Sequence, residues 1–311
     1  MKNLLAAVLP SIFRMSWILL GLFLLFVVLW GWYSSNLVIT MERSPLSVIP
    51  AAFGLAYEET TFPAPDGVVL KGWFVPAAKP SDTTIVLCHG WGADRANLLP
   101  STVFLNQRGG YNLCYFDFRN HGESGGTRSS LGPLEIGDME AALDYITRAK
   151  PEQTRRLGVY GLSMGAAVAL TVTARDPRIE AVVAESAFSS FNGVVARFAR
   201  IFYGVPRLPF VPMTLFFVRA RLGIDPELSS PVRFIDRIAP RPVFLIQGDK
   251  DERMPPSEGA ALFSRAKEPK TLWTIPGADH GEAAEVAGKE YQDRLLQFYD
   301  GVFRKQTSLS R

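Results

Sequence analysis

One long apolar stretch dominates the beginning of the chain. No charged residue occurs from Met15 to Met41, and the segment from Trp17 to Tyr33 is almost wholly hydrophobic, with aromatic residues near both ends. About 20 helical residues at a rise of about 1.5 Å each cross the hydrocarbon core of a bilayer, and Trp and Tyr favour its two interfaces. The pattern predicts a transmembrane helix.

A retained helix fits this stretch better than the two alternatives. A helix that packs on the core of a globular domain usually keeps one polar side, and no polar side interrupts this stretch. A signal peptide has a shorter apolar stretch and small residues at its cleavage site, whereas Trp30, Trp32 and Tyr33 are bulky. Lys2 and Arg14 precede the helix, so the positive-inside rule favours a cytoplasmic N-terminus and places the rest of the chain on the opposite side.

From residue 59 onward, short runs rich in β-branched residues alternate with longer segments of helical spacing. Strands are expected at 59–64, 68–76, 84–88, 111–118, 156–160, 179–184, 243–247 and 271–275, and helices at 96–108, 138–150, 164–175, 257–266 and 289–303. The first two strands flank the turn Pro65-Asp66-Gly67 and form a hairpin. The later alternation predicts parallel βαβ units in one sheet.

The alternation lapses at about 188–230, which predicts an insertion above the carboxyl ends of the strands, where open α/β sheets bind ligands. This cap combines aromatic residues with arginines: Arg197, Arg200, Arg207, Arg219 and Arg221. Two interpretations stay open. The aromatic residues could pack the cap onto the core, or they could line an acyl pocket while the arginines attract anionic lipid headgroups.

Composition narrows the class of protein. The 311 residues are 48% hydrophobic and 20% charged, and the formal net charge of +3 is spread without basic clusters, so nucleic acid is not an expected partner.

The two cysteines, Cys88 and Cys114, lie in apolar strand-like runs and are expected to be buried free thiols, with a disulfide as the alternative. No spacing of ligands predicts a metal site, and no phosphate-binding loop predicts a cofactor.

Ser163 is the predicted nucleophile. It is the centre of Gly161-Leu162-Ser163-Met164-Gly165, which follows an apolar strand and begins an Ala-rich helix. A G-x-S-x-G sequence between a strand and a helix forms a strained turn that exposes the serine hydroxyl beside amide donors. The motif alone is weak evidence, and its strand and helix neighbours make it strong.

A serine nucleophile needs a base and an orienting acid. Of the three histidines, His280 follows the last expected strand, whereas His89 and His121 lie in earlier loops, so His280 is the predicted base. Asp249 and Asp251 both follow the strand at 243–247, and Asp251 is preferred because it lies further out of the strand. Backbone N–H groups of Trp91 and Met164 are the expected oxyanion donors.

Six segments in order resemble the α/β-hydrolase superfamily, in particular its serine aminopeptidase and prolyl-oligopeptidase-like members. They are CHGWGAD from Cys88, YFDFRNHGESGG from Tyr115, VYGLSMGAA from Val159, AESAFSS from Ala184, IQGDKDERMPP from Ile246 and PGADHGE from Pro276. The resemblance implies a mostly parallel eight-stranded sheet with helices on both faces. It also implies a triad of Ser163, Asp251 and His280, with Trp91 and Met164 at the oxyanion hole.

These observations predict an ordered division of the chain. We expect an N-terminal cytoplasmic segment at 1–14, a transmembrane helix at 15–38, a linker at 39–54, an α/β-hydrolase domain at 55–303 with its cap at about 188–230, and a polar tail at 304–311. The expected activity is hydrolysis of small acyl esters, lipid-like esters or thioesters. A serine peptidase or amidase is the second hypothesis, and an inactive membrane-anchored interaction protein is the third.

Overall fold

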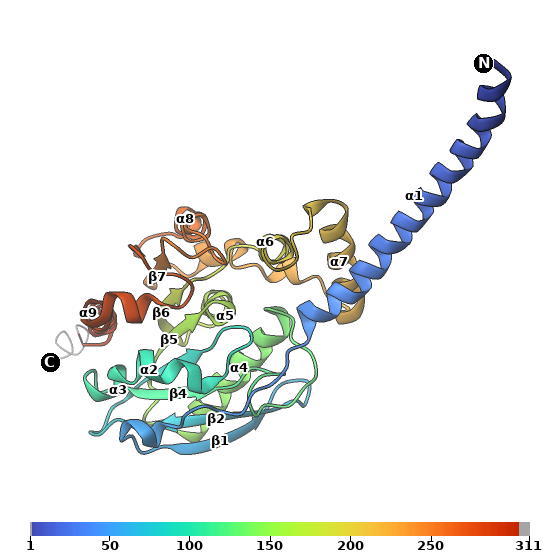
Figure 1. Cartoon of the computed structure of the whole chain (residues 1–311). Coiled ribbons are helices and arrows are strands. Elements are labelled where there is room, and N and C mark those ends of the chain that lie inside the picture. Colours follow the sequence, from blue (N-terminus) through green and yellow to red (C-terminus); the bar gives the residue numbers. More distant parts are fainter. Residues whose placement is uncertain (1, 305–311) are drawn as a thin grey trace.

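The computed structural model describes residues 2–304 around one sheet of eight strands (Figure 1). The strands are β1 (Glu58–Pro63), β2 (Val69–Val75), β3 (Thr83–Cys88), β4 (Asn112–Phe116), β5 (Arg156–Leu162), β6 (Ile179–Glu185), β7 (Val243–Gly248) and β8 (Lys270–Ile275). Their order is β1-β2-β4-β3-β5-β6-β7-β8. β2 is antiparallel to β1 and β4, and every other neighbouring pair is parallel.

Helices surround the sheet and extend beyond it. They are α1 (Lys2–Ile39), α2 (Leu99–Thr102), α3 (Phe104–Gln107), α4 (Pro133–Ala149), α5 (Met164–Thr173), α6 (Phe191–Tyr203), α7 (Arg207–Leu222), α8 (Pro256–Arg265) and α9 (Ala283–Phe303). Short 3-10 turns lie at Pro50–Phe53, Arg95–Leu98, Pro226–Ser229, Pro231–Arg233 and Ile235–Arg237.

Two hydrophobic cores lie on opposite faces of the sheet, because successive strand residues point to opposite sides. On β3, Val86 and Cys88 belong to the core with α4, α5 and α8, whereas Ile85 and Leu87 belong to the core with α2, α3 and α9. Apart from the edge strand β8, the parallel strands are therefore largely buried on both faces, which is typical of parallel sheets. Cys88 and Cys114 are buried free thiols in this structure.

Three helices of the α/β domain depart from the expected boundaries by more than two residues. The helix expected at 96–108 is divided into a 3-10 turn, α2 and α3, because Pro100 lies where a continuous helix would need a backbone N–H. α4 begins at Pro133, five residues before the expected start of 138, and the Glu135 carboxylate accepts the Gly132 N–H at 2.8 Å. α9 begins at Ala283 but is kinked at Gly288, immediately before the expected start of 289.

The N-terminal helix α1 projects from the body and touches it only near its C-terminal end (Figure 1). Its segment Pro10–Ile39 is long and apolar enough to cross a membrane. The helix is longer than the expected 15–38, since it begins at Lys2. The expected tail at 304–311 lies outside the described residues except for Arg304.

The interruption of the sheet pattern at 188–230 is a pair of helices, α6 and α7, that meet at a bend of 119°. α7 packs against the C-terminal part of α1, where Gly31 faces Met213 and Trp32 contacts the ring of Phe217. The cap therefore joins the N-terminal helix to the rest of the molecule.

Candidate active site

Ser163 lies in the tight turn between β5 and α5, with φ of 56° and ψ of −117°. A positive φ is unfavourable for any residue with a Cβ atom, so the surrounding structure must hold this conformation. The Ser163 N–H donates to the Glu185 carbonyl at 2.8 Å, which fixes the turn to β6. The serine side chain is consequently presented at the carboxyl edge of the sheet.

Glycines on both sides of Ser163 are required by close backbone approaches. A Cβ atom at Gly161 would lie 2.4 Å from the Gly165 carbonyl oxygen, and one at Gly165 would lie 2.1 Å from the Cys88 carbonyl oxygen. Such distances to backbone atoms leave no room for a methyl group. The two outer positions of the G-x-S-x-G motif thus pack α5 directly against β3 and β5.

A chain of hydrogen bonds links Ser163, His280 and Asp251. His280 Nε2 lies 3.1 Å from Ser163 Oγ, and His280 Nδ1 lies 2.8 Å from Asp251 Oδ2. The other Asp251 oxygen accepts the Met254 N–H at 2.7 Å, so the carboxylate is held from both sides. Asp251 is buried, which keeps water from competing for the imidazole.

Asp249, the competing acid, has a different contact. Its Oδ1 accepts the Gly277 N–H at 2.7 Å, which joins the loop after β7 to the loop after β8. The loops pack so closely that a Cβ atom at Gly248 would lie 2.2 Å from the Ala278 carbonyl oxygen. The structure therefore places Asp251 beside His280, and Asp249 at the base of the two loops.

A cavity of about 150 Å³ opens in front of Ser163. Trp91 and Met164, the expected oxyanion donors, both line it together with His280. The remaining lining comes from several segments and is mostly apolar: Met41, Gly92, Leu131, Phe188, Val194, Phe198, Phe202, Arg253 and Met254. Met41, which follows the N-terminal helix, and Leu131 carried no sequence signal for this position.

Comparison with known proteins identifies the superfamily of the chain. Residues 79–216 match the model of a family described as serine aminopeptidase, S33, and this match includes Ser163. The protein YfhR of Escherichia coli (strain K12) is 30% identical over 248 residues, which cover 78% of this chain and 80% of that protein. This chain belongs to the α/β-hydrolase superfamily.

Solved structures agree with this assignment. The esterase Pf2001 of Pyrococcus furiosus aligns with a TM-score of 0.71 and 28% identity, over 84% of this chain and 98% of that one. A further sequence relative, YqkD of Bacillus subtilis (strain 168), is 29% identical over 79% of this chain and 80% of its own length. The mostly parallel eight-stranded sheet is therefore that of an α/β hydrolase.

His89 shapes the loop of this α/β hydrolase that carries Trp91. Its Nε2 accepts the Phe118 N–H at 3.0 Å and its Nδ1 lies 2.7 Å from the Gly90 carbonyl oxygen, so Nδ1 carries the proton. Burial lowers the pKa of the His89 imidazole well below its ordinary value, and the neighbouring His121 adds to this shift. A neutral His89 holds the loop beside Ser163.

The segment after β4 is fixed by buried ion pairs, as its polar sequence predicts. The Asp117 carboxylate accepts the Arg95 N–H at 2.7 Å and also pairs with the Arg95 guanidinium. Arg119 pairs with Asp138 at 2.6 Å and with Asp66 at the same distance. These contacts anchor the loop that supplies the Phe118 N–H to His89.

Glu185, the last residue of β6, has a structural role. Its buried carboxylate accepts hydrogen bonds from Tyr291 at 2.8 Å and from Tyr160 at 3.0 Å, and it also contacts the backbone at Ala283. Burial raises the pKa of this carboxyl. Glu185 therefore connects the strand beside Ser163 to the beginning of α9, which follows the His280 loop.

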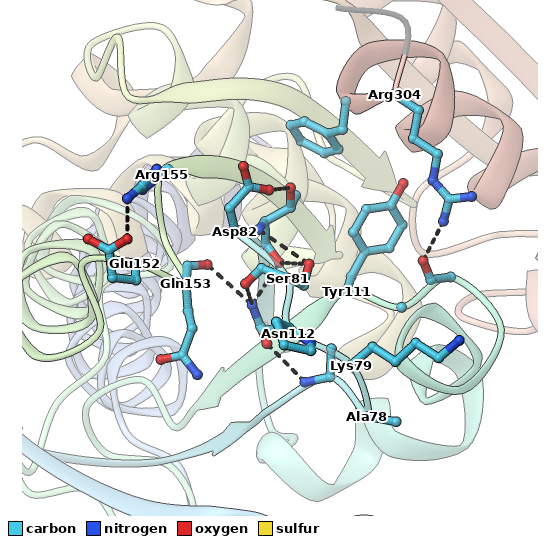
Figure 2. Close-up of a pocket in the computed structure, with 16 residues that line it drawn as sticks. Ala78, Lys79, Ser81, Asp82, Tyr111, Asn112, Glu152, Gln153, Arg155 and Arg304 are labelled. Carbon is cyan, nitrogen blue, oxygen red and sulfur yellow. Dashed lines mark hydrogen bonds and ion pairs between the residues drawn. The ribbon is translucent and has the colours of Figure 1, made fainter. Parts of the chain in front are cut away.

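A wider cavity, of about 790 Å³, lies at the opposite edge of the sheet, near the beginnings of β3 and β4 (Figure 2). Its polar residues largely satisfy one another: Asn112 donates to the Ser81 carbonyl at 3.0 Å, and Arg155 pairs with Glu152. Across residues 2–304, no cluster of three or more His, Cys, Asp or Glu side chains is arranged to hold a metal ion.

Proposed function

We propose that this α/β hydrolase is a membrane-anchored serine hydrolase that cleaves carboxylic esters or thioesters through an acyl-enzyme. The observation that carries the proposal is the continuous hydrogen-bond chain from Asp251 through His280 to Ser163, at the edge of an apolar cavity. As Ser163 Oγ attacks the acyl carbon, His280 Nε2 takes its proton, and Asp251 stabilises the resulting imidazolium.

The same groups complete acylation and then carry out deacylation. His280 returns the proton to the departing alkoxide or thiolate as the carbon–oxygen or carbon–sulfur bond breaks. Water then attacks the acyl carbon while His280 takes a proton from it; the bond from the acyl carbon to Ser163 Oγ breaks, His280 returns the proton to Oγ, and the carboxylic acid is released. The N–H groups of Trp91 and Met164 would stabilise the negative carbonyl oxygen, at about 3 kcal/mol for each donor.

The lining of the cavity favours esters over aminopeptidase substrates. An aminopeptidase must hold the positively charged α-amino group of its substrate, and a carboxylate is the natural partner for that charge. Among the described residues that line this cavity none carries a carboxylate, and Arg253 adds a positive charge at its rim. A neutral acyl group fits such a site, whereas a free ammonium group does not.

Covalent labelling tests the chemistry. A fluorophosphonate probe should label the purified full-length protein, and Ser163→Ala should abolish the labelling. Turnover of a panel of acyl esters, acyl thioesters and aminoacyl amides then separates the two substrate classes. Labelling that persists in Ser163→Ala would refute the mechanism, and turnover of the amides alone would replace the esterase by a peptidase.

The same proposal places the catalytic domain across the membrane from the N-terminus. It is supported by the apolar segment Pro10–Ile39 and by Lys2 and Arg14, the two positive residues that precede the uncharged run beginning at Met15. Protease added outside intact cells or spheroplasts should digest the domain and spare a tag on the N-terminus. A protected domain in sealed membranes would reverse the orientation.

A further inference from the structure

A second cavity, of about 280 Å³, lies between the N-terminal helix and the cap. α1 forms one wall with Trp30, Leu37 and Val38, and α6 forms the opposite wall, which includes Val195 and Ala199. The N-terminal helix is therefore part of a cavity of the catalytic domain as well as a membrane segment.

The lining of this cavity is predominantly apolar; outside the pair Ser34 and Thr214, its polar side-chain atoms are the Tyr203 hydroxyl and the ring N–H groups of Trp30 and Trp91. Ser34 of α1 and Thr214 of α7 line this cavity, and their hydroxyl oxygens form a hydrogen bond of 2.7 Å with each other. No residue of the described lining is charged. A cavity with such walls binds apolar groups, because polar groups would lose hydrogen bonds to water without replacement.

The second cavity adjoins the Ser163 cavity and shares part of its wall. Trp91, Leu131, Phe198 and Phe202 line both of them. Trp91 belongs to the loop beside Ser163, and its ring contacts that of Phe198 with 6.5 Å between centroids. An acyl chain whose carbonyl carbon faces Ser163 would thus extend past these shared side chains toward α1.

We infer that the cavity between α1 and α6 is the acyl-chain site of this hydrolase, and that the N-terminal helix supplies one of its walls. The inference rests on the proposed function and deepens it, since it assigns the substrate class as esters of medium-length fatty acids. At about 30 Å³ for each methylene, close to the share of one water molecule in the liquid, the cavity takes about nine methylene groups.

The rim of the cavity lies where the apolar helix leaves the body. Tyr203 and Phe202, at the end of α6, are 48% and 53% exposed, and the Tyr203 ring meets the Trp30 ring with 5.7 Å between centroids. From this point toward the N-terminus, α1 is mostly exposed and apolar. An acyl chain can therefore pass from the bilayer into the cavity along α1 without crossing water.

Two substitutions on the same helix test the wall. Leu37→Trp adds bulk inside the cavity, and Leu29→Trp makes the same change at a position that is 57% exposed. The full-length protein in detergent is assayed with p-nitrophenyl esters from acetate to decanoate. In the parent protein, kcat/KM should rise about fourfold for each added methylene, the gain expected for burying one methylene.

The readout is the ratio of kcat/KM for octanoate to that for acetate. We expect Leu37→Trp to lower this ratio by about tenfold or more, the effect of excluding about two methylenes, and Leu29→Trp to leave it at the parent value. Ala199→Leu, which fills the cavity from the cap side, should lower this ratio as well. If Leu37→Trp does not fold, the ratio measured for Ala199→Leu tests the acyl-chain site.

Failure of the inference can be told from failure of the proposed function. If the parent protein neither reacts with a fluorophosphonate nor hydrolyses the acetate ester, the proposed function is wrong. A protein that hydrolyses acetate, with a flat chain-length profile or with an octanoate ratio that neither Leu37→Trp nor Ala199→Leu lowers, keeps the proposed function and overturns the acyl-chain site.

Discussion

The Ser34 hydroxyl on α1 lies 2.7 Å from the Thr214 hydroxyl on α7, although 180 residues separate the two in the sequence. Thr214 also donates to the Phe210 carbonyl at 3.1 Å, and Arg221 lies over the Trp32 ring at 3.8 Å from its centroid. These contacts fix the last turns of the N-terminal helix on the cap. The helix thus has a defined position relative to the active site.

Because α1 lies close to α7, we expect Gly31→Ala to push the two helices apart. A Cβ atom there would lie 2.4 Å from Met213 Cγ and 2.9 Å from the Met213 backbone carbon, so the two helices must separate. Gly21→Ala on the same helix is the control, because nothing lies within 4 Å of its added Cβ. Disulfide cross-linking of a Ser34→Cys/Thr214→Cys variant measures the approach.

We expect Gly31→Ala to reduce the cross-linked fraction severalfold at equal oxidant, and Gly21→Ala to leave it unchanged. Cys88 and Cys114 are buried, and burial raises the pKa of both thiols, so they should not compete for the oxidant. Equal cross-linking in both glycine variants would mean that the α1–α7 contact tolerates a methyl group.

The turn that carries Ser163 predicts that Gly165→Ala abolishes activity. Its Cβ would lie 2.1 Å from the Cys88 carbonyl oxygen and 2.5 Å from the His89 carbonyl oxygen, so both the nucleophile and the Trp91 loop must shift. Gly301→Ala in α9 has nothing within 4 Å of the added Cβ and should stabilise the protein by up to about 1 kcal/mol. Fluorophosphonate labelling and thermal unfolding of the two variants check this contrast.

The two aspartates after β7 should differ in their effect on turnover. Asp251→Asn removes the acceptor that orients His280 Nδ1–H, and the expected loss of kcat is on the order of 10⁴, the cost of this change in a serine protease triad. Asp249→Asn weakens only the contact with the Gly277 N–H, at about 1 kcal/mol of stability. Comparable losses of kcat from the two variants would contradict the assignment of Asp251.

His89 predicts a loss of stability in mild acid. In the folded protein burial keeps its pKa well below the ordinary value of 6.5, whereas in the unfolded chain it binds a proton below that pH. The unfolded state therefore gains protons as the pH falls, and the stabilisation present above pH 6.5 is lost below it. The contribution of His89 should lower the free energy of unfolding by about 1.4 kcal/mol for each unit that the pH falls below about 6.5.

The slope of that dependence is the measurement. Urea unfolding of the detergent-solubilised protein between pH 5 and 7, at about half-unit steps, should show a smaller slope for His89→Phe than for the parent, whatever the absolute stability of the variant. An unchanged slope would show that His89 is not the group responsible.

The sheet and the order of the chemical groups followed from the sequence because they depend on local patterns. Continuous apolar runs at 84–88 and 243–247 specify buried parallel strands, and the glycines around Ser163 specify a turn that few other residues could form. His280 and Asp251 were predicted as base and acid, and the structure brings both to Ser163.

Contacts between distant segments could not be predicted in the same way. No local pattern pairs Ser34 with Thr214, and none brings Met41 to the cavity at Ser163, because these approaches depend on how the cap folds over the sheet edge. The break after Leu98 and the kink at Gly288, in contrast, occur near Pro100 and at a glycine with positive φ, and the spacing of apolar residues does not register either of them. Periodicity detects a helix and leaves its interruptions open.

The arginines of the cap were interpreted together from the sequence, and the structure divides them. Arg197 pairs with Glu258, Arg219 pairs with Asp225 at 3.0 Å, and Arg221 is held against α1. Arg200 and Arg207 are exposed at the corner between α6 and α7. This corner lies beside α1 and also exposes apolar side chains, with Leu208 72% exposed (Figure 1).

The exposed corner predicts that anionic lipid activates the enzyme through Arg200 and Arg207. Each cation near an anionic bilayer contributes about 1 kcal/mol, so the pair strengthens contact of the corner with the surface by about 30-fold at low salt. Turnover of a vesicle-embedded octanoyl ester by the reconstituted protein should rise with the fraction of anionic lipid, and added salt should abolish this rise.

The double substitution Arg200→Gln with Arg207→Gln should remove most of the response to anionic lipid, whereas Arg219→Gln, at a residue paired with Asp225, should keep it. A response that survives the double substitution, or that disappears in Arg219→Gln as well, would place the lipid contact elsewhere on the cap.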